Sequence, residues 1–74
     1  MNKTDKNKLL RAGYRIIRAD DQPTPRIKEY RMHLVDGEKY VSNGDYYTIE
    51  KFETKAARDR AMKIMLLDER TIED

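Results

Sequence analysis

Three stretches of the chain are rich in β-branched and aromatic residues, as β-strands are. They are "YRIIRAD" at 14–20, "RIKEYRMHLV" at 26–35 and "YYTIEKF" at 46–52. In the second stretch, strict alternation places Tyr30, Met32 and Leu34 on one face, with polar residues on the other. The pattern therefore predicts a small antiparallel sheet with one buried face.

A helical pattern follows the last strand. Thr54 is a suitable N-cap for "KAARDRAMKIMLLDE", a run of strong helix formers without glycine or proline. We predict a helix over 54–68. At 100° per residue, one side of it carries the apolar residues expected to pack on the sheet. These are Ala57, Ala61, Ile64 and Met65, with Leu67 at the margin.

A shorter helix is predicted within residues 1–13. Thr4 can cap its beginning, and Gly13 can take the left-handed position just after its end. At the other end of the chain, residues 69–74 are mostly acidic and contain a single large apolar side chain, Ile72. A terminus with so little to bury is expected to be a mobile tail.

Two dipeptides that favour tight turns, Asp36-Gly37 and Asn43-Gly44, lie between the second and third strands. If both form two-residue turns, a short fourth strand lies between them and two rows of opposed residues result. These rows are Met32–Val41–Tyr46, expected beneath the 54–68 helix, and His33–Tyr40–Tyr47 on the outer face.

The alternative is a single loop from about 36 to 45 that joins strand 26–35 directly to strand 46–52. Ile49 falls on the same face as Tyr47, so the predicted outer face is not purely polar. A slip of one residue in register would exchange the two faces. The sequence leaves both arrangements open.

Together these elements predict an α+β fold. The sheet is an antiparallel meander of three or four strands, with the C-terminal helix packed on one face and a short N-terminal helix. With 74 residues the chain is expected to be one domain, 1–74.

Composition narrows the possibilities for function. The chain has no cysteine, which excludes disulfides and thiolate zinc sites. It has no run of 18 apolar residues and no apolar signal segment, so we expect a cytoplasmic protein without membrane contact. Residues 1–35 carry nine basic and four acidic side chains, a balance of +5, although the net charge of the chain is only +2. A basic front half permits an anionic partner without requiring one.

Residues suited to catalysis are few. His33 is the only histidine, Ser42 is the only serine, and nothing in their spacing indicates a nucleophile–base pair. There is no glycine-rich phosphate loop, and the Asp20-Asp21 pair is typical of a turn before Pro23. We therefore predict that the protein is not an enzyme and that it binds no cofactor or metal.

The predicted order of elements resembles, in outline, the double-stranded RNA-binding domain. That family has a basic cluster at the start of its final helix, where this chain has Lys55, Arg58 and Arg60. The chain departs from the family's pattern in "EKFETKAARDR", which lacks the glycine-rich approach and the adjacent lysines. The resemblance implies contact with duplex phosphates, and the departure puts that contact in doubt.

Two hypotheses for function follow. The first is a small regulatory module that binds a partner protein or a second copy of itself, with Arg58, Met62 and Leu66 on the outer side of the last helix as contacts. The second is binding of RNA or single-stranded DNA, in which aromatic and basic side chains of the outer sheet face form a stacking platform. The residues of that platform would be Arg31, His33, Tyr40, Tyr47 and Lys51.

Overall fold

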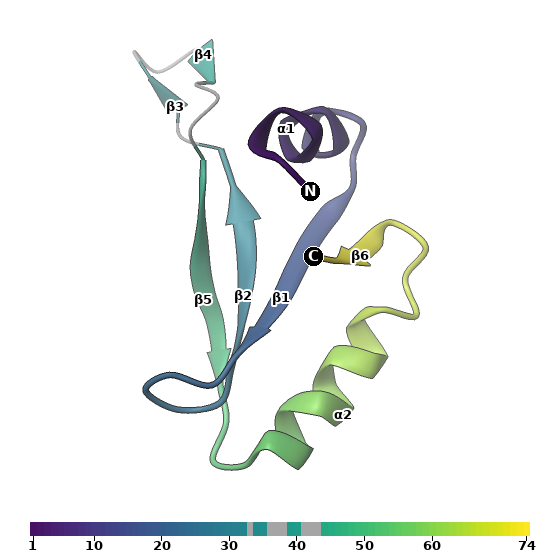
Figure 1. Ribbon diagram of the computed structural model, residues 1–74. Coiled ribbons are helices and arrows are strands. Elements are labelled where there is room, and N and C mark those ends of the chain that lie inside the picture. Colours follow the sequence, from purple (N-terminus) through teal and green to yellow (C-terminus); the bar gives the residue numbers. More distant parts are fainter. Residues whose placement is uncertain (33, 36–38, 41–43) are drawn as a thin grey trace.

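The computed structural model describes residues 1–32, 34–35, 39–40 and 44–74, and in it two helices pack against a four-stranded sheet (Figure 1). Along the chain the elements are α1 (Lys3–Arg11), β1 (Arg15–Asp20), β2 (Arg26–Arg31), β3 (Leu34–Val35), β4 (Lys39–Tyr40), β5 (Asp45–Lys51), α2 (Lys55–Met65) and β6 (Thr71–Glu73). The predicted α+β class, with an N-terminal and a C-terminal helix, is confirmed.

The strands of the main sheet lie in the order β5-β2-β1-β6, and β3 and β4 form a separate two-stranded sheet. β1 pairs with β2, and β2 with β5, in antiparallel fashion, whereas β6 pairs with β1 in parallel. The sheet is therefore mixed because of its last strand.

Residues 71–73 were expected to belong to a mobile tail, and the structure places them in β6 instead. Ile72 lies opposite Ile16, and Thr71 is buried. The Asp74 N–H donates to the carbonyl of Ile17 at 2.9 Å, which continues the pairing to the last residue. Backbone hydrogen bonds hold this end of the chain in place. The apolar content of a segment does not predict such bonds.

The second and third long strands pair directly, as in the alternative, but β4, which pairs with β3, lies within the stretch from about 36 to 45 that the alternative expected to be a single loop. Tyr30 of β2 lies opposite Tyr46 of β5, and Glu29 lies opposite Tyr47. The predicted pairing of Tyr47 with Tyr40 is therefore wrong, and Val41, the predicted partner of Tyr46, is not among the described residues. β3 and β4 pair with Leu34 opposite Tyr40, one residue away from the expected pairing of Tyr40 with His33.

His33, Asp36-Gly37, Val41 and Asn43 lie outside the described residues. Gly44 is described, and its φ is not in the left-handed region that a two-residue turn at Asn43-Gly44 requires. Gly44 instead leads into β5 beside Tyr30, which fills the space where a side chain would be.

The helix boundaries follow capping chemistry. The Thr54 side chain accepts a hydrogen bond from the Ala57 N–H at 3.1 Å, as the sequence predicted for the start of α2. α1 begins earlier than predicted, because the Asn2 side chain and not that of Thr4 is its cap, accepting from the Asp5 N–H at 2.8 Å. Gly13 has φ of 93°, the expected left-handed residue after the end of α1.

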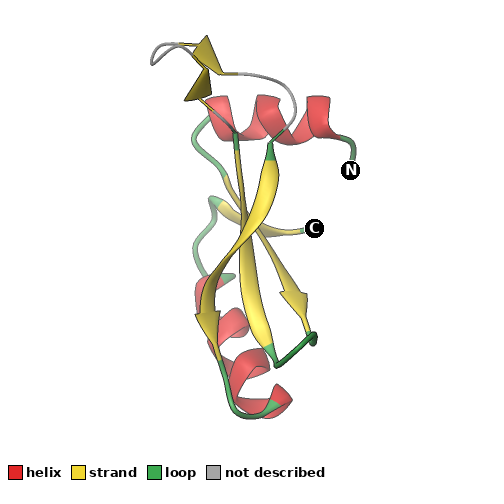
Figure 2. Ribbon diagram, turned by 90° about the vertical axis from the view of Figure 1, so that its left-hand side faces the viewer, coloured by secondary structure: helices red, strands yellow, loops and turns green. Residues whose placement is uncertain are grey.

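The two helices cover opposite faces of the sheet. Ile16 and Ile17 are neighbours on β1, so their side chains point to opposite faces, yet both are fully buried. Ile17 packs with Ile27 and with Met62 of α2, while Tyr30, on the other face, hydrogen-bonds to α1. Figure 2 shows α1 across one end of the strands and α2 beside the other end.

The expectation that Tyr30 lies beneath the C-terminal helix is thus wrong. α1 covers Tyr30, and α2 covers the face that carries Ile17 and Ile27. Ile49, which conflicted with a polar outer face, is half-buried and packs against the core beneath α2. Because both faces have a helix, neither face is the wholly polar one that the alternation suggested.

Candidate interaction surface

The buried side of α2 is centred on Arg58 and Met62. Met62 is 5% exposed and Arg58 is 7% exposed, and the side chains of Met65 and Leu66 are partly buried against the same core. Met62, Leu66 and Arg58 were proposed as exposed contacts for a partner. Met62 and Arg58 are buried and Leu66 is partly buried, so the predicted exposure of this side is wrong.

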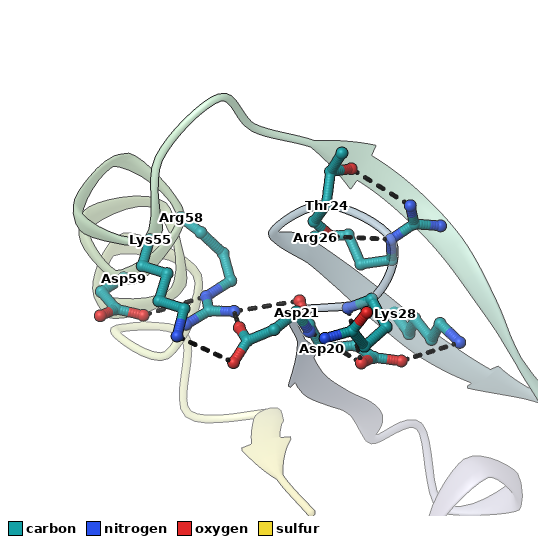
Figure 3. A network of polar contacts seen from close by, with 9 residues as sticks. Asp20, Asp21, Thr24, Arg26, Lys28, Lys55, Arg58 and Asp59 are labelled. Carbon is teal, nitrogen blue, oxygen red and sulfur yellow. Dashed lines mark hydrogen bonds and ion pairs between the residues drawn. The ribbon is translucent and has the colours of Figure 1, made fainter.

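Arg58 can be buried because the Nε and Nη1 atoms of its guanidinium both donate to nearby oxygen atoms (Figure 3). Its Nη1 donates to the carboxylate of Asp21 and, at 3.0 Å, to the carbonyl of Asp20, while its Nε donates to Asp59 Oδ1 at 3.0 Å. The Arg58 hydrogen bond lowers the pKa of Asp21, and the same bond raises the pKa of Arg58. This pairing attaches the first turns of α2 to the end of β1.

The connection between β1 and β2 is itself fixed by polar contacts, as Figure 3 also shows. The Asp20 carboxylate accepts from the Asp21 N–H at 2.7 Å, which confirms the turn role of the Asp20-Asp21 pair. Lys28 Nζ lies 3.1 Å from the same carboxylate, and their hydrogen bond lowers the pKa of Asp20. Arg26 donates to the Thr24 carbonyl at 3.0 Å. α2 is therefore attached to a connection whose own conformation is fixed by hydrogen bonds and an ion pair.

The C-terminal end of α2 and the turn that follows it present two large apolar side chains to solvent. Ile64 is 69% exposed and Leu67 is 81% exposed, more than any other large apolar residue that the structure describes. Ile64 lies in the last turn of α2, and Leu67 lies in the turn just after the helix, where its N–H donates to the Ile64 carbonyl at 3.2 Å. The prediction that Ile64 packs on the sheet, with Leu67 at the margin of the same side, is therefore wrong.

Charged residues precede and follow this apolar pair. Arg60 and Lys63 come before it along the chain and Asp68 and Glu69 after it, and all four are exposed. Within the described residues, Arg60, Lys63 and Glu69 form no ion pair, and the Asp68 carboxylate accepts only from the Arg70 N–H at 2.9 Å. We call this set the outer α2 surface; its members are Arg60, Lys63, Ile64, Leu67, Asp68 and Glu69.

A second cluster of aromatic and basic residues lies on the α1 side of the sheet. The rings of Tyr30 and Tyr46 meet edge to face with centroids 5.4 Å apart, and Lys6 Nζ lies 4.7 Å from the centroid of Tyr46. The Tyr46 hydroxyl donates to the carboxylate of Asp74, which Lys6 also contacts at 3.1 Å. Burial, together with this bond, raises the pKa of Tyr46. The rings of Tyr30 and Tyr46 are thus in contact with other residues of the same chain.

The residues proposed for a nucleic-acid platform are not brought together as predicted. Tyr47 is 41% exposed but lies opposite Glu29, and exposed Arg31 lies opposite Asp45. Lys51 is exposed, at the far end of β5 from Asp45. The backbone of Tyr40 lies in β4, in the separate two-stranded sheet, and His33 lies outside the described residues.

In the part of the chain that the structure describes, no pocket is present, and no group of three or more His, Cys, Asp or Glu residues could hold a metal ion. Neither described helix has the length and apolar character needed to cross a membrane. Comparison of the chain with known protein families, with curated proteins and with solved structures finds no match.

Proposed function

We propose that the protein is a non-catalytic interaction module that binds a partner protein through the outer α2 surface. The observation that carries the proposal is the exposure of Ile64 and Leu67, which are 69% and 81% accessible to solvent. Ile64 is in the last turn of α2 and Leu67 is in the turn just after it, and α2 itself is held in place by buried contacts. Exposed apolar side chains rimmed by charged ones are characteristic of surfaces that bind proteins.

The way α2 is held supports this role. Met62 and Ile17 pack beneath the helix, and Arg58 joins its first turns to Asp21. A contact surface on such an element needs little ordering when a partner binds, so less conformational entropy is lost on association. The module would act by occupying the surface of its partner.

Binding of RNA or single-stranded DNA, the second hypothesis, draws less support. Several basic side chains are engaged in ion pairs within the chain, among them those of Lys6, Arg15 and Lys28. Tyr46 is packed between Lys6 and Arg18, so its ring is less open for stacking with a base. Sites for single strands combine open aromatic faces with free basic groups.

Affinity capture tests the proposal. The full chain and its Ile64→Glu/Leu67→Glu variant are immobilised and exposed to an extract of the cells that make the protein, with and without nuclease. We expect a protein partner that nuclease does not release and that the double variant retains at least about tenfold less, since two charges would replace the apolar contacts.

Lys8→Glu is the matched control, because it lies exposed on α1 and changes the net charge by the same two units. It should retain the partner. Equal capture by the wild type and the double variant would contradict the proposed surface. Capture that nuclease abolishes would favour the nucleic-acid hypothesis instead.

A further inference from the structure

The charges of the outer α2 surface change sign along the chain. Arg60 and Lys63 precede Ile64 and Leu67, and the acidic residues follow them. The surface thus runs from a basic end through an apolar centre to an acidic end, over a few residues on an exposed part of the molecule. A surface of this kind complements itself when it meets an inverted copy.

We propose that the occupant of this surface is a second copy of the same chain, with the C-terminal ends of the two α2 helices and the turns that follow them packed antiparallel about a two-fold axis. The inference rests on the proposed function, because it names the partner of that surface. In a two-fold interface, residue i of one copy contacts residue j of the other, and j contacts i. An axis between Ile64 and Leu67 sets Ile64 of each copy against Leu67 of the other.

The same axis determines the charge contacts. Lys63 and Glu69 lie on either side of the apolar pair, so Lys63 of each copy faces the acidic turn of the other, where Glu69 is exposed. Neither residue has an ion-pair partner within the described part of its own chain. A parallel arrangement would instead set like charges against like, which is unfavourable. Charge therefore selects the antiparallel arrangement.

The contact is small, and its consequence is a weak, concentration-dependent dimer. Two apolar side chains per copy give an interface at the low end of the range for transient protein complexes. The charged rim is solvent-exposed, so added salt should weaken the association by screening. Both properties can be measured with the full chain alone.

The experiment is sedimentation of the full chain over a series of concentrations, for the wild type and for charge-reversal variants. Lys63→Glu alone, or Glu69→Lys alone, sets like charges together twice in each symmetric dimer and should weaken association about tenfold. An equimolar mixture of the two variants restores both attractive contacts and should associate like the wild type. The double variant Lys63→Glu/Glu69→Lys should also recover.

Recovery in the mixture supports the antiparallel dimer, because a simple loss of folding could not be repaired by mixing. A wild-type chain that stays monomeric at every concentration overturns the inference, as does association that neither single variant weakens. The proposed function is tested separately. If the chain stays monomeric but its captured partner is lost in Ile64→Glu/Leu67→Glu, that function stands and the surface has a different occupant.

Discussion

Gly44 shows how closely single residues are fitted in the α1 side of the core. A Cβ atom at this position would clash with the backbone carbonyl oxygen of Arg31, its nearest neighbour, and would lie 2.7 Å from the hydroxyl oxygen of Tyr30 and 2.8 Å from its Cζ. The Tyr30 hydroxyl donates to the side chain of Asn7 at 2.7 Å and also accepts from the Gly44 backbone. The ring therefore cannot move aside without losing buried hydrogen bonds.

We predict that Gly44→Ala destabilises the protein by about 1–3 kcal/mol, the usual cost of overpacking a core. The measurement is the free energy of unfolding in urea. A variant with an unchanged unfolding midpoint would contradict the close contact between Gly44 and Tyr30.

The sequence predicted a two-residue turn at Asn43-Gly44, but glycine is needed at position 44 for a different reason. Asn-Gly is a strong turn signal, since glycine readily adopts positive φ. Gly44 is required here because the Arg31 carbonyl and the Tyr30 ring fill the space beside its backbone, and its φ is not in the left-handed region. A dipeptide carries no information about a side chain from another strand, so the register could not be derived from it.

At the scale of elements, the orientation of α2 decides which residues are available to a partner. In the second half of this helix and at its C-cap, apolar residues lie on both the buried and the exposed side: Ala61, Met62, Ile64, Met65 and Leu66. Periodicity therefore predicted the helix and its Thr54 cap but could not choose its buried face. The choice depends on Arg58, whose burial requires the Asp21 carboxylate and the Asp20 carbonyl.

We predict very different losses of stability for two alanine substitutions that are two positions apart. Met62→Ala should cost about 2–5 kcal/mol because it leaves a cavity beside Ile17 and Ile27. Ile64→Ala should change the free energy of unfolding by less than about 0.5 kcal/mol, since its side chain is in solvent. Chemical denaturation of the two variants measures both values, and equal losses would show that the assigned face is wrong.

At the scale of the whole molecule, Asp74 joins the end of the chain to its beginning. Its carboxylate accepts from the Tyr46 hydroxyl and pairs with Lys6 of α1 at 3.1 Å. These two contacts lower the pKa of Asp74, the Tyr46 bond being the larger cause. The sequence could not reveal this, because "TIED" has little apolar content and its bonds are with residues near the other end of the chain.

We predict that Asp74→Asn lowers stability at neutral pH by about 1 kcal/mol, typical of a lost charge-assisted hydrogen bond. A lowered pKa means that the folded state binds the proton more weakly than the unfolded state. The contribution is therefore complete above the ordinary Asp value of 3.8 and is lost as the pH falls through the lowered pKa.

Urea unfolding of the wild type and Asp74→Asn at pH 7 and near pH 3 measures this effect. The difference between the two proteins should shrink at the acid pH. Glu73→Gln is the control, because Glu73 is exposed and forms no ion pair within the described residues. A difference that persists undiminished in acid would contradict the role given to the Asp74 carboxylate.

The position of β1 has a consequence for how the molecule comes apart. Ile16 and Ile17 belong to two separate small cores, one beneath each helix, and share a single stretch of backbone. Removing either helix would expose one side of this strand to water and loosen the support of the other helix. Neither half of the molecule, a helix with the core beneath it, is large enough to stay folded without the other. The two halves should therefore melt as one cooperative unit, although no direct contact between the helices is needed for it.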